Sequence, residues 1–356
     1  MRAWLDINLE NLHYNTEKLK EISNKKIIAV LKANAYGLGI SDIANFLYKS
    51  GVDFYAVATV EEGIEIRKIL SDVKILVLGI LYEEEIEIAQ KNNLAITVSD
   101  FKSLEFIVKN KIKIDIHLKI DTGMTRIGFN ANQLEKVLNY CDENNVYIEG
   151  IFSHLSDADG KNEESKKYTK MQLRKFKESV INTNKNFKYI HILNTAGAIN
   201  YSDFDFGNYA RIGIGLYGYM GNKTVDKLKS VFTLKSKILF IKKVEEDTYV
   251  SYGRKYKISK GETYAVISLG YADGLKRYLR NGYILVNNHR ADIIGEICMD
   301  MFMVKIPKEI ENNIEVGQEV TVLNEKIIND VNYDDFSLWE VMTGLGKRVK
   351  RIYLGE

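Results

Sequence analysis

The feature that most constrains the fold is a regular alternation of short apolar segments with charged segments of helical periodicity. The apolar segments cover residues 27–31, 54–58, 75–78, 94–98, 114–120, 147–153, 189–193 and about 204–209. Eight strands that alternate with helices over roughly 200 residues predict a (β/α)8 barrel of the TIM type. A doubly wound open sheet is the alternative, but no Gly-x-Gly-x-x-Gly turn follows the first strand, which favours the barrel.

Beyond residue 218 the pattern changes to short β-rich runs separated by turn pairs such as Gly-Glu, Asn-Gly and Asn-Asn. The runs cover residues 231–244, 248–251, 264–269, 283–286, 291–294, 302–306 and 319–323, with a helix expected at 336–345. We therefore expect two domains: the barrel over residues 1–225 and a mostly β domain over residues 226–356. Residues 2–8 could add a strand, and residues 8–22 have helical spacing.

Composition limits the classes of partner. The 356 residues are 46% hydrophobic and 28% charged, and the net charge is +2, so neither nucleic acid nor an anionic membrane is an expected partner. Cys141 and Cys298 lie far apart and offer no metal-ligand spacing, so no metal is expected. The first residues lack the apolar core of a signal peptide, and we expect a cytoplasmic protein.

Chemically reactive residues follow most of the predicted barrel strands. Taken singly, each of them is more often a surface or structural residue. In a barrel the carboxyl ends of the strands meet at one mouth, which is where such folds carry their active sites. A lysine, an arginine, a histidine and a glycine-rich segment at one mouth suit a phosphorylated cofactor held as an imine.

Residues 29–39 read Ala-Val-Leu-Lys-Ala-Asn-Ala-Tyr-Gly-Leu-Gly. This stretch resembles the cofactor attachment segment of bacterial alanine racemases, which are pyridoxal 5'-phosphate enzymes of fold type III. The resemblance implies that Lys32 forms the internal aldimine with pyridoxal phosphate and that Tyr36 contacts the cofactor phosphate.

The segment that begins at Arg211 carries the resemblance further, because it reads Arg-Ile-Gly-Ile-Gly-Leu-Tyr-Gly. In the family this arginine faces the pyridine nitrogen and the next amides hold phosphate, which implies those roles for Arg211, Gly213 and Ile214. Arginine stays protonated at any working pH, so a ring nitrogen that faces it is kept unprotonated. The electron sink is thereby weakened, which in the family is taken to favour racemisation over side reactions.

Other barrel positions match the family pattern as well. His154 would stack on the cofactor and bridge Arg211 to a catalytic tyrosine, and Asn194-Thr195 resembles an Asn-Ser pair whose hydroxyl reaches the phosphate.

The segment 121–128 reads Asp-Thr-Gly-Met-Thr-Arg-Ile-Gly, where Thr125 replaces the family's usual glycine. Arg126 would lie near the cofactor's phenolic oxygen and the substrate carboxylate. Lys119 matches a lysine that is often carbamylated, and such a carbamate would fix the arginine.

Three motifs in the second domain follow the family in order: Ser-Tyr-Gly, Gly-Tyr-Ala-Asp-Gly and Gly-Glu-Ile-Cys-Met-Asp. The resemblance implies that Tyr252 is a catalytic base and that Tyr271 lies at the entrance of the site. Arg277 matches an arginine of the access path, and Met299 and Asp300 match residues that line the substrate site. Near the end, Lys350 replaces a proline of the family, and Lys347 stands where a tyrosine is frequent.

The resemblance implies alanine racemase activity that feeds D-alanine to peptidoglycan synthesis in the cell wall. Racemisation needs a base on each face of a planar carbanion, and Lys32 and Tyr252 would serve the two faces. In the family the tyrosine comes from the other subunit, so a homodimer with shared active sites is expected. A serine or broad-specificity racemase is the main alternative. A decarboxylase of the same architecture should lack the two tyrosine motifs, and a non-catalytic carrier would normally end near residue 230.

Overall fold

The computed structural model describes residues 1–330 and 336–355 and divides into two compact units. One unit spans His13–Met220, and the other combines Met1–Leu12 with Gly221–Glu356. Among the described residues, no helix combines the length and the apolar content needed to cross a membrane.

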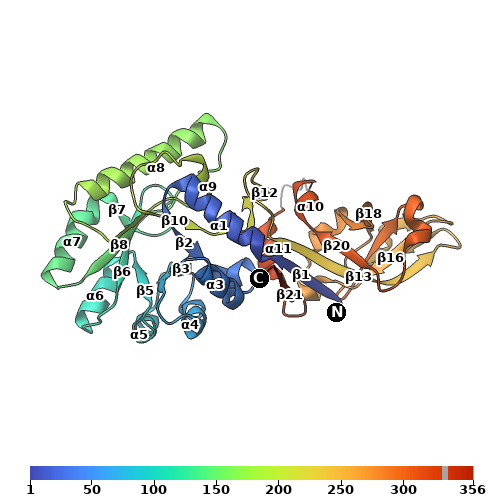
Figure 1. Cartoon of the computed structure of the whole chain (residues 1–356), viewed down its shortest axis with the longest axis horizontal. Coiled ribbons are helices and arrows are strands. Elements are labelled where there is room, and N and C mark those ends of the chain that lie inside the picture. The colour runs from blue at the N-terminus through green and yellow to red at the C-terminus, as the bar shows by residue number, and fades with distance from the viewer. Residues whose placement is uncertain (331–335, 356) are drawn as a thin grey trace. The chain divides into compact units, whose positions relative to one another are not determined.

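The first unit is a closed barrel of eight parallel strands, as predicted (Figure 1). The strands are β2 (Lys26–Val30), β3 (Phe54–Val57), β4 (Lys74–Val77), β5 (Ala95–Val98), β6 (Ile116–Asp121), β8 (Ile148–Phe152), β9 (Tyr189–His191) and β10 (Tyr209–Ile212). Their order is β5-β4-β3-β2-β10-β9-β8-β6, and pairing of β6 with β5 closes the ring. The short strand β7 (Phe129–Asn130) pairs parallel with the end of β6.

Helices connect the strands and cover the outside of the barrel (Figure 1). They are α1 (Leu9–Ser23), α2 (Lys32–Tyr36), α3 (Ile40–Lys49), α4 (Val60–Ile69), α5 (Glu83–Lys91), α6 (Phe101–Lys109), α7 (Leu134–Glu143), α8 (Glu163–Ile181) and α9 (Thr195–Asn200), with 3-10 turns η1 (Ala131–Gln133) and η2 (Ile214–Tyr217). Polar caps fix where several of them begin: Asp100 accepts from the amide of Ser103 at 2.9 Å, and Asn162 accepts from that of Ser165 at 2.7 Å.

The eighth barrel strand differs from the prediction. It was expected at about residues 204–209, but β10 runs from Tyr209 to Ile212, so Arg211 lies inside a strand. The aromatic residues of the expected segment are interrupted by a turn in which Gly207 has φ +86°. An arginine in a sequence does not suggest a buried strand, because burying its charge is costly unless the guanidinium is hydrogen-bonded. The strand was therefore predicted to end before Arg211.

The second unit is built on an eight-stranded sheet of order β16-β19-β18-β17-β20-β13-β1-β21. Its strands are β1 (Ala3–Asn8), β13 (Phe232–Lys243), β16 (Thr263–Ile267), β17 (Tyr283–Val286), β18 (His289–Ile294), β19 (Phe302–Ile306), β20 (Glu319–Leu323) and β21 (Lys350–Leu354). The smaller elements are β11 (Tyr219–Met220), β12 (Lys223–Thr224), β14 (Thr248–Val250), β15 (Tyr256–Ile258), η3 (Tyr252–Arg254), η4 (Tyr271–Asp273), η5 (Arg277–Asn281), η6 (Lys308–Asn313), α10 (Glu325–Asp330) and α11 (Leu338–Gly344).

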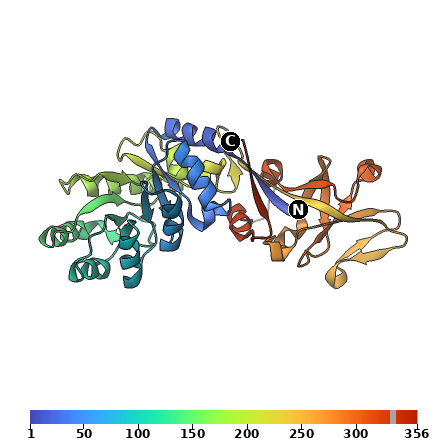
Figure 2. The same ribbon diagram turned by 60° about the horizontal axis from the view of Figure 1, so that its bottom comes forward.

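The first strand of the chain belongs to this second sheet. β1 pairs antiparallel with β13 and parallel with β21, so the blue first strand lies beside the dark red last one (Figure 2). The barrel unit therefore does not start at residue 1, in contrast to the expected span 1–225. The reason is tertiary: an alternating six-residue strand carries no sign of which sheet it will join.

Candidate functional site

Lys32 stands two residues beyond Val30, the last residue of β2, and so lies at the carboxyl end of that strand. The next four residues, from Ala33 to Tyr36, all have φ between +53° and +57°, the left-handed region. Left-handed backbone costs an ordinary residue about 1–2 kcal/mol, and such strain concentrates at functional sites. Glu62 braces the turn, since its carboxylate accepts from the amides of Ala33 at 2.6 Å and Ala58 at 2.8 Å.

The Lys32 ammonium is exposed at the barrel mouth, but its surroundings favour the neutral amine. Partial burial lowers its pKa, and the charge of Arg126 lowers it further, against the opposing effect of Glu62. A neutral amine is the nucleophilic form, so this lysine suits Schiff-base chemistry.

A second group of residues gathers around Thr195 and Gly213. The amides of Gly213 and Gly215 lie 3.4 Å and 3.2 Å from the Thr195 hydroxyl. A Cβ placed on Gly213 would come within 2.3 Å of the Tyr36 hydroxyl, so that hydroxyl reaches the same glycine segment. Asn194 supports the cluster by accepting from the amide of Gly197 at 2.8 Å, which caps α9.

Arg211 is only 3% exposed and is held on several sides. Its guanidinium donates to the backbone oxygens of Ser153 at 2.7 Å and His191 at 3.1 Å, and to the Nδ1 atoms of His191 at 2.6 Å and His154 at 2.9 Å. Burial lowers its pKa to about 9, with a contribution from Arg126, so it stays protonated at neutral pH.

His154 shows that the barrel residues converge. Burial holds its pKa well below the usual range, and the charges of Arg211, Lys119, Arg126 and Lys32 act in the same direction. These cations come from three strands, β2, β6 and β10, or the loops that follow them, yet all are close enough to influence one imidazole. The predicted convergence at one mouth is thus present in the structure.

Lys119 is 3% exposed and donates to the backbone oxygen of Ile120 at 2.9 Å. Burial lowers its pKa to about 7, helped by Arg211 and Arg126 and opposed by Asp121. In the following loop Thr125 has φ +56°, which explains why glycine suits this position better than a β-branched residue.

The second-domain motifs also come together, within their own unit. Ser251 donates through its hydroxyl to the backbone oxygen of Glu296 at 2.7 Å, which places the Tyr252 loop against the Glu296–Cys298 segment. The amide of Tyr271 donates to the Cys298 oxygen at 3.1 Å. Tyr252 itself is 72% exposed.

Two ionic clusters in this unit were not predicted. Arg348 bridges the carboxylates of Asp273 and Asp300, at 2.8 Å from each. The buried carboxylate of Glu296 contacts Lys255 at 2.7 Å and Arg277 at 3.1 Å, so the expected access-path arginine is anchored. The only signal in sequence was that each of these charges stands within or next to a recognised motif.

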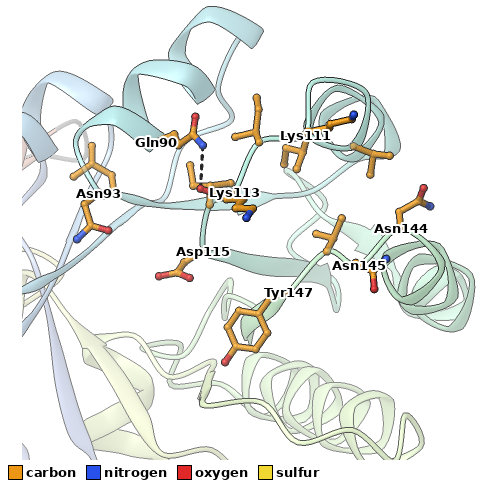
Figure 3. A pocket seen from close by; sticks show the side chains of 14 residues that line it. Gln90, Asn93, Lys111, Lys113, Asp115, Asn144, Asn145 and Tyr147 are labelled. Carbon is orange, nitrogen blue, oxygen red and sulfur yellow. Dashed lines mark hydrogen bonds between the residues drawn. The ribbon is translucent and has the colours of Figure 1, made fainter.

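A surface pocket of about 550 Å³ lies elsewhere, among the loops that lead into β5, β6 and β8 (Figure 3). Because those loops precede the strands, the pocket is at the amino end of the barrel, opposite Lys32. Asp115 and Tyr147 line it, and none of the predicted site residues does.

Comparisons with known proteins agree with these observations. The family model described as "Alanine racemase, N-terminal domain" matches residues 7–221, and the model of the C-terminal domain matches residues 231–353. An alanine racemase of Fusobacterium nucleatum is 51% identical over 99% of both chains, and one of Clostridium novyi is 37% identical over 99% of this chain and 95% of the relative.

Solved structures agree as well. The alanine racemase of Clostridium difficile 630 is 33% identical, with a TM-score of 0.89 over 99% of this chain and 96% of that one. The Bartonella henselae alanine racemase "with covalently bound pyridoxal phosphate" is 27% identical, with a TM-score of 0.87 over 99% of this chain and 100% of that one. With both family models matched along nearly its whole length, this chain belongs to the alanine racemase family.

Proposed function

We propose that this protein interconverts L-alanine and D-alanine with pyridoxal phosphate and supplies D-alanine for peptidoglycan. The observation that carries the proposal is the convergence of Lys32, Lys119, Arg126 and Arg211 on His154 at the barrel mouth. The family match and the cofactor named in the Bartonella henselae structure support the choice of cofactor.

The residues present fit the two ends of that cofactor. The Thr195 hydroxyl, which accepts from the amides of Gly213 and Gly215, and the Tyr36 hydroxyl offer donors for a phosphate, and the absence of a side chain at Gly213 lets the Tyr36 hydroxyl approach this segment. The amide of Ile214, the first residue of η2, would add a donor. Arg211 would face the ring nitrogen, and as a group with only donors it would keep that nitrogen unprotonated.

Pyridoxal phosphate, when bound, supplies an electron sink that acidifies the α-hydrogen of an amino acid. Lys32 would hold the cofactor and then, as a free amine, take or return a proton on one face. The partner subunit's Tyr252 would do the same on the other face, and Arg126 would bind the substrate carboxylate. Met299 and Asp300 would complete the substrate site, with Tyr271 and Arg277 along the access path.

His154 would connect Arg211 to the second base. Because arginine only donates, the Nδ1 atom of His154 accepts, and its hydrogen must be on Nε2. An Nε2–H group is a suitable donor to the oxygen of the partner subunit's Tyr252 and would stabilise its phenolate. The proposed homodimer therefore has two active sites, each completed by the other chain.

Lys119 would act as a carbamate. An amine with a pKa of about 7 is neutral in about half of the molecules at pH 7, and the neutral amine can add CO2 with release of a proton. The product exchanges a buried cation for an anion beside Arg126, which would fix that arginine. The carbamate is testable by 13C NMR of the protein in 13C-bicarbonate.

The decisive experiment is racemisation by purified wild type in heavy water. We expect interconversion of L- and D-alanine with solvent deuterium at Cα, and borohydride reduction should add the cofactor mass to Lys32. Protein that neither racemises alanine nor binds the cofactor at Lys32 would refute the proposal. Parallel kinetics on serine and lysine would detect the alternative, a serine or broad-specificity racemase.

Replacing Tyr252 tests the second base. Tyr252→Phe should lower the rate of racemisation by a factor of about 10²–10⁴, the usual contribution of a general base, because the phenolic oxygen is lost. Tyr249→Phe is a matched control, since Tyr249 is another exposed tyrosine of the same β14–β15 hairpin. Equal rates in both variants would rule out Tyr252 as a base.

A further inference from the structure

A row of buried polar side chains runs through the barrel interior behind Arg211. It contains His191 and His117, both 0% exposed, and Glu149, which is 4% exposed. The Nδ1 atom of His191 is 2.6 Å from the Arg211 guanidinium, and its Nε2 atom is 3.0 Å from Nδ1 of His117. Beyond it, Nε2 of His117 faces the Glu149 carboxylate at 3.6 Å.

The chemistry of arginine fixes the direction of this row. A guanidinium can only donate, so His191 accepts at Nδ1 and carries its hydrogen on Nε2. That hydrogen is donated to Nδ1 of His117, which therefore also carries its hydrogen on Nε2. Among the described residues, Nε2 of His117 has no hydrogen-bond partner, and it faces the Glu149 carboxylate. A hydrogen on Nε2 makes this contact attractive, whereas an Nε2 atom without hydrogen would direct its lone pair at the lone pairs of the carboxylate.

We propose that Glu149 is the anionic end of a one-directional chain, running from Arg211 through His191 and His117, that positions Arg211 for the cofactor ring. The proposal rests on the proposed function for the role of Arg211 at the ring. The chain itself rests only on the contacts above. His191, His117 and Glu149 are positioning residues, since they act through Arg211.

Electrostatics support the charge states that the chain requires. Burial alone would raise the pKa of Glu149, but contacts with His117 and Lys74 lower it to about 2, so the carboxylate stays ionised. Burial lowers the pKa of both His117 and His191, which keeps the imidazoles neutral. Two neutral imidazoles hydrogen-bonded between the Arg211 cation and the Glu149 anion let each charge partly offset the cost of burying the other.

Both ends of the chain meet further charges. At the Glu149 end, Lys74 contacts the carboxylate and also pairs with Asp115 at 2.6 Å, while Lys188 approaches Glu149 at 3.3 Å. Asp115 lines the surface pocket at the amino end of the barrel (Figure 3). The row of side chains from Arg211 to Glu149 thus spans the barrel from the end that carries Lys32 to the opposite end. At the Arg211 end, the nearby cations are Lys119 and Arg126.

Gly150 makes the packing of the chain possible. A Cβ at this position would lie 2.5 Å from Nδ1 of His117, the atom that accepts from His191. Any side chain there would displace the imidazole from the row. Gly150→Ala therefore offers a way to break the chain that leaves every charge in place.

The first test uses wild-type apoprotein with 15N-labelled histidine and needs no activity. We expect NMR to show His117, His154 and His191 as neutral Nε2–H tautomers, with the exposed His13 and His289 as internal references. A hydrogen on Nδ1 of His117 or His191, or a charged imidazole at neutral pH, would overturn the inference.

The second test uses Glu149→Gln, which removes the charge and keeps the shape. With the anion gone, we expect kcat to fall roughly tenfold, the usual cost of losing a residue that supports a group in direct contact with the bound cofactor or metal. We also expect the pH profile of kcat and the absorption spectrum of the holoenzyme to shift. Asp205→Asn is the control, because Asp205 also pairs with a lysine, Lys177, but at the surface. A merely structural Glu149 would lower Tm and leave the profile and spectrum unchanged, which would refute the proposal.

Two further comparisons separate the possible failures. If Glu149→Gln does not fold, Gly150→Ala should produce the same spectral shift, and an unchanged spectrum in that variant would also refute the role. An inactive wild type with the expected tautomers would overturn the proposed function and leave the chain standing. An active wild type with other tautomers would overturn only the chain.

Discussion

At the scale of single residues, burial decides the chemistry of Lys119. Its pKa of about 7 lies well below the ordinary value of 10.5, mainly because the folded barrel excludes water from the ammonium. Between these two values the unfolded chain binds a proton that the folded protein lacks. Stability must therefore rise with pH across this window, by at most about 1.4 kcal/mol per pH unit from this one residue.

Lys119→Met removes that pH dependence. We expect the free energy of unfolding of wild-type apoprotein to rise more steeply than that of the variant between about pH 7 and about pH 9. Urea denaturation in buffers free of CO2 measures both. Parallel curves for the two proteins would show that Lys119 titrates normally in the folded state.

The sequence predicted which residues would carry the chemistry but not how they are supported. Lys32, Arg126, His154 and Arg211 were found because they stand in recognisable motifs. His117 was missed, although it alternates with Lys119 along β6 and so lies on the same face of the strand. The partners of such a residue come from other strands, and no local pattern shows which strand will be opposite.

At the scale of elements, the left-handed turn after β2 is the clearest strain. Ala33→Gly should stabilise the protein by about 1 kcal/mol, because glycine adopts positive φ without a steric penalty. Ala44→Gly in the right-handed helix α3 is the comparison, and it should destabilise by at least about 1 kcal/mol. Chemical denaturation measures both, and a loss of stability in Ala33→Gly would contradict the strain argument.

Element prediction worked best where the apolar period was strong. The seven barrel strands from β2 to β9 were predicted within a few residues, and β17, β19 and β20 match their expected segments. The short strand β15 and the last strand β21 were missed. β21 is rich in charge and lies at the edge of its sheet, so its pairing with β1 gives it strand structure that its own sequence does not suggest.

At the scale of the whole molecule, the proposed sharing of active sites between two subunits makes a strict prediction. Lys32→Ala and Tyr252→Phe should each be nearly inactive alone. After the two proteins are unfolded together and refolded, roughly half of the dimers should be mixed, each with one intact site, and roughly a quarter of wild-type activity should return. If Tyr252 acted within its own chain, no activity would reappear.

The second sheet should depend on both ends of the chain. A fragment of residues 221–356 lacks β1 and leaves the edge of β13 unpaired on that side. We expect it to stay unfolded or aggregate by circular dichroism and size-exclusion chromatography. Fusing residues 1–12 to its carboxyl end through a flexible linker should improve folding. A stable folded fragment without β1 would contradict this expectation.

The position of β1 also bears on the order in which the two units can fold during synthesis. A ribosome releases this strand first, but its partners β13 and β21 emerge only after the whole barrel has been made. The barrel can therefore assemble during translation, whereas the eight-stranded sheet of the unit that contains Tyr252 can be completed only after β21 has been synthesised. A nascent chain stalled before that point would carry Lys32 in a complete barrel but Tyr252 in a domain whose main sheet still lacks an edge strand.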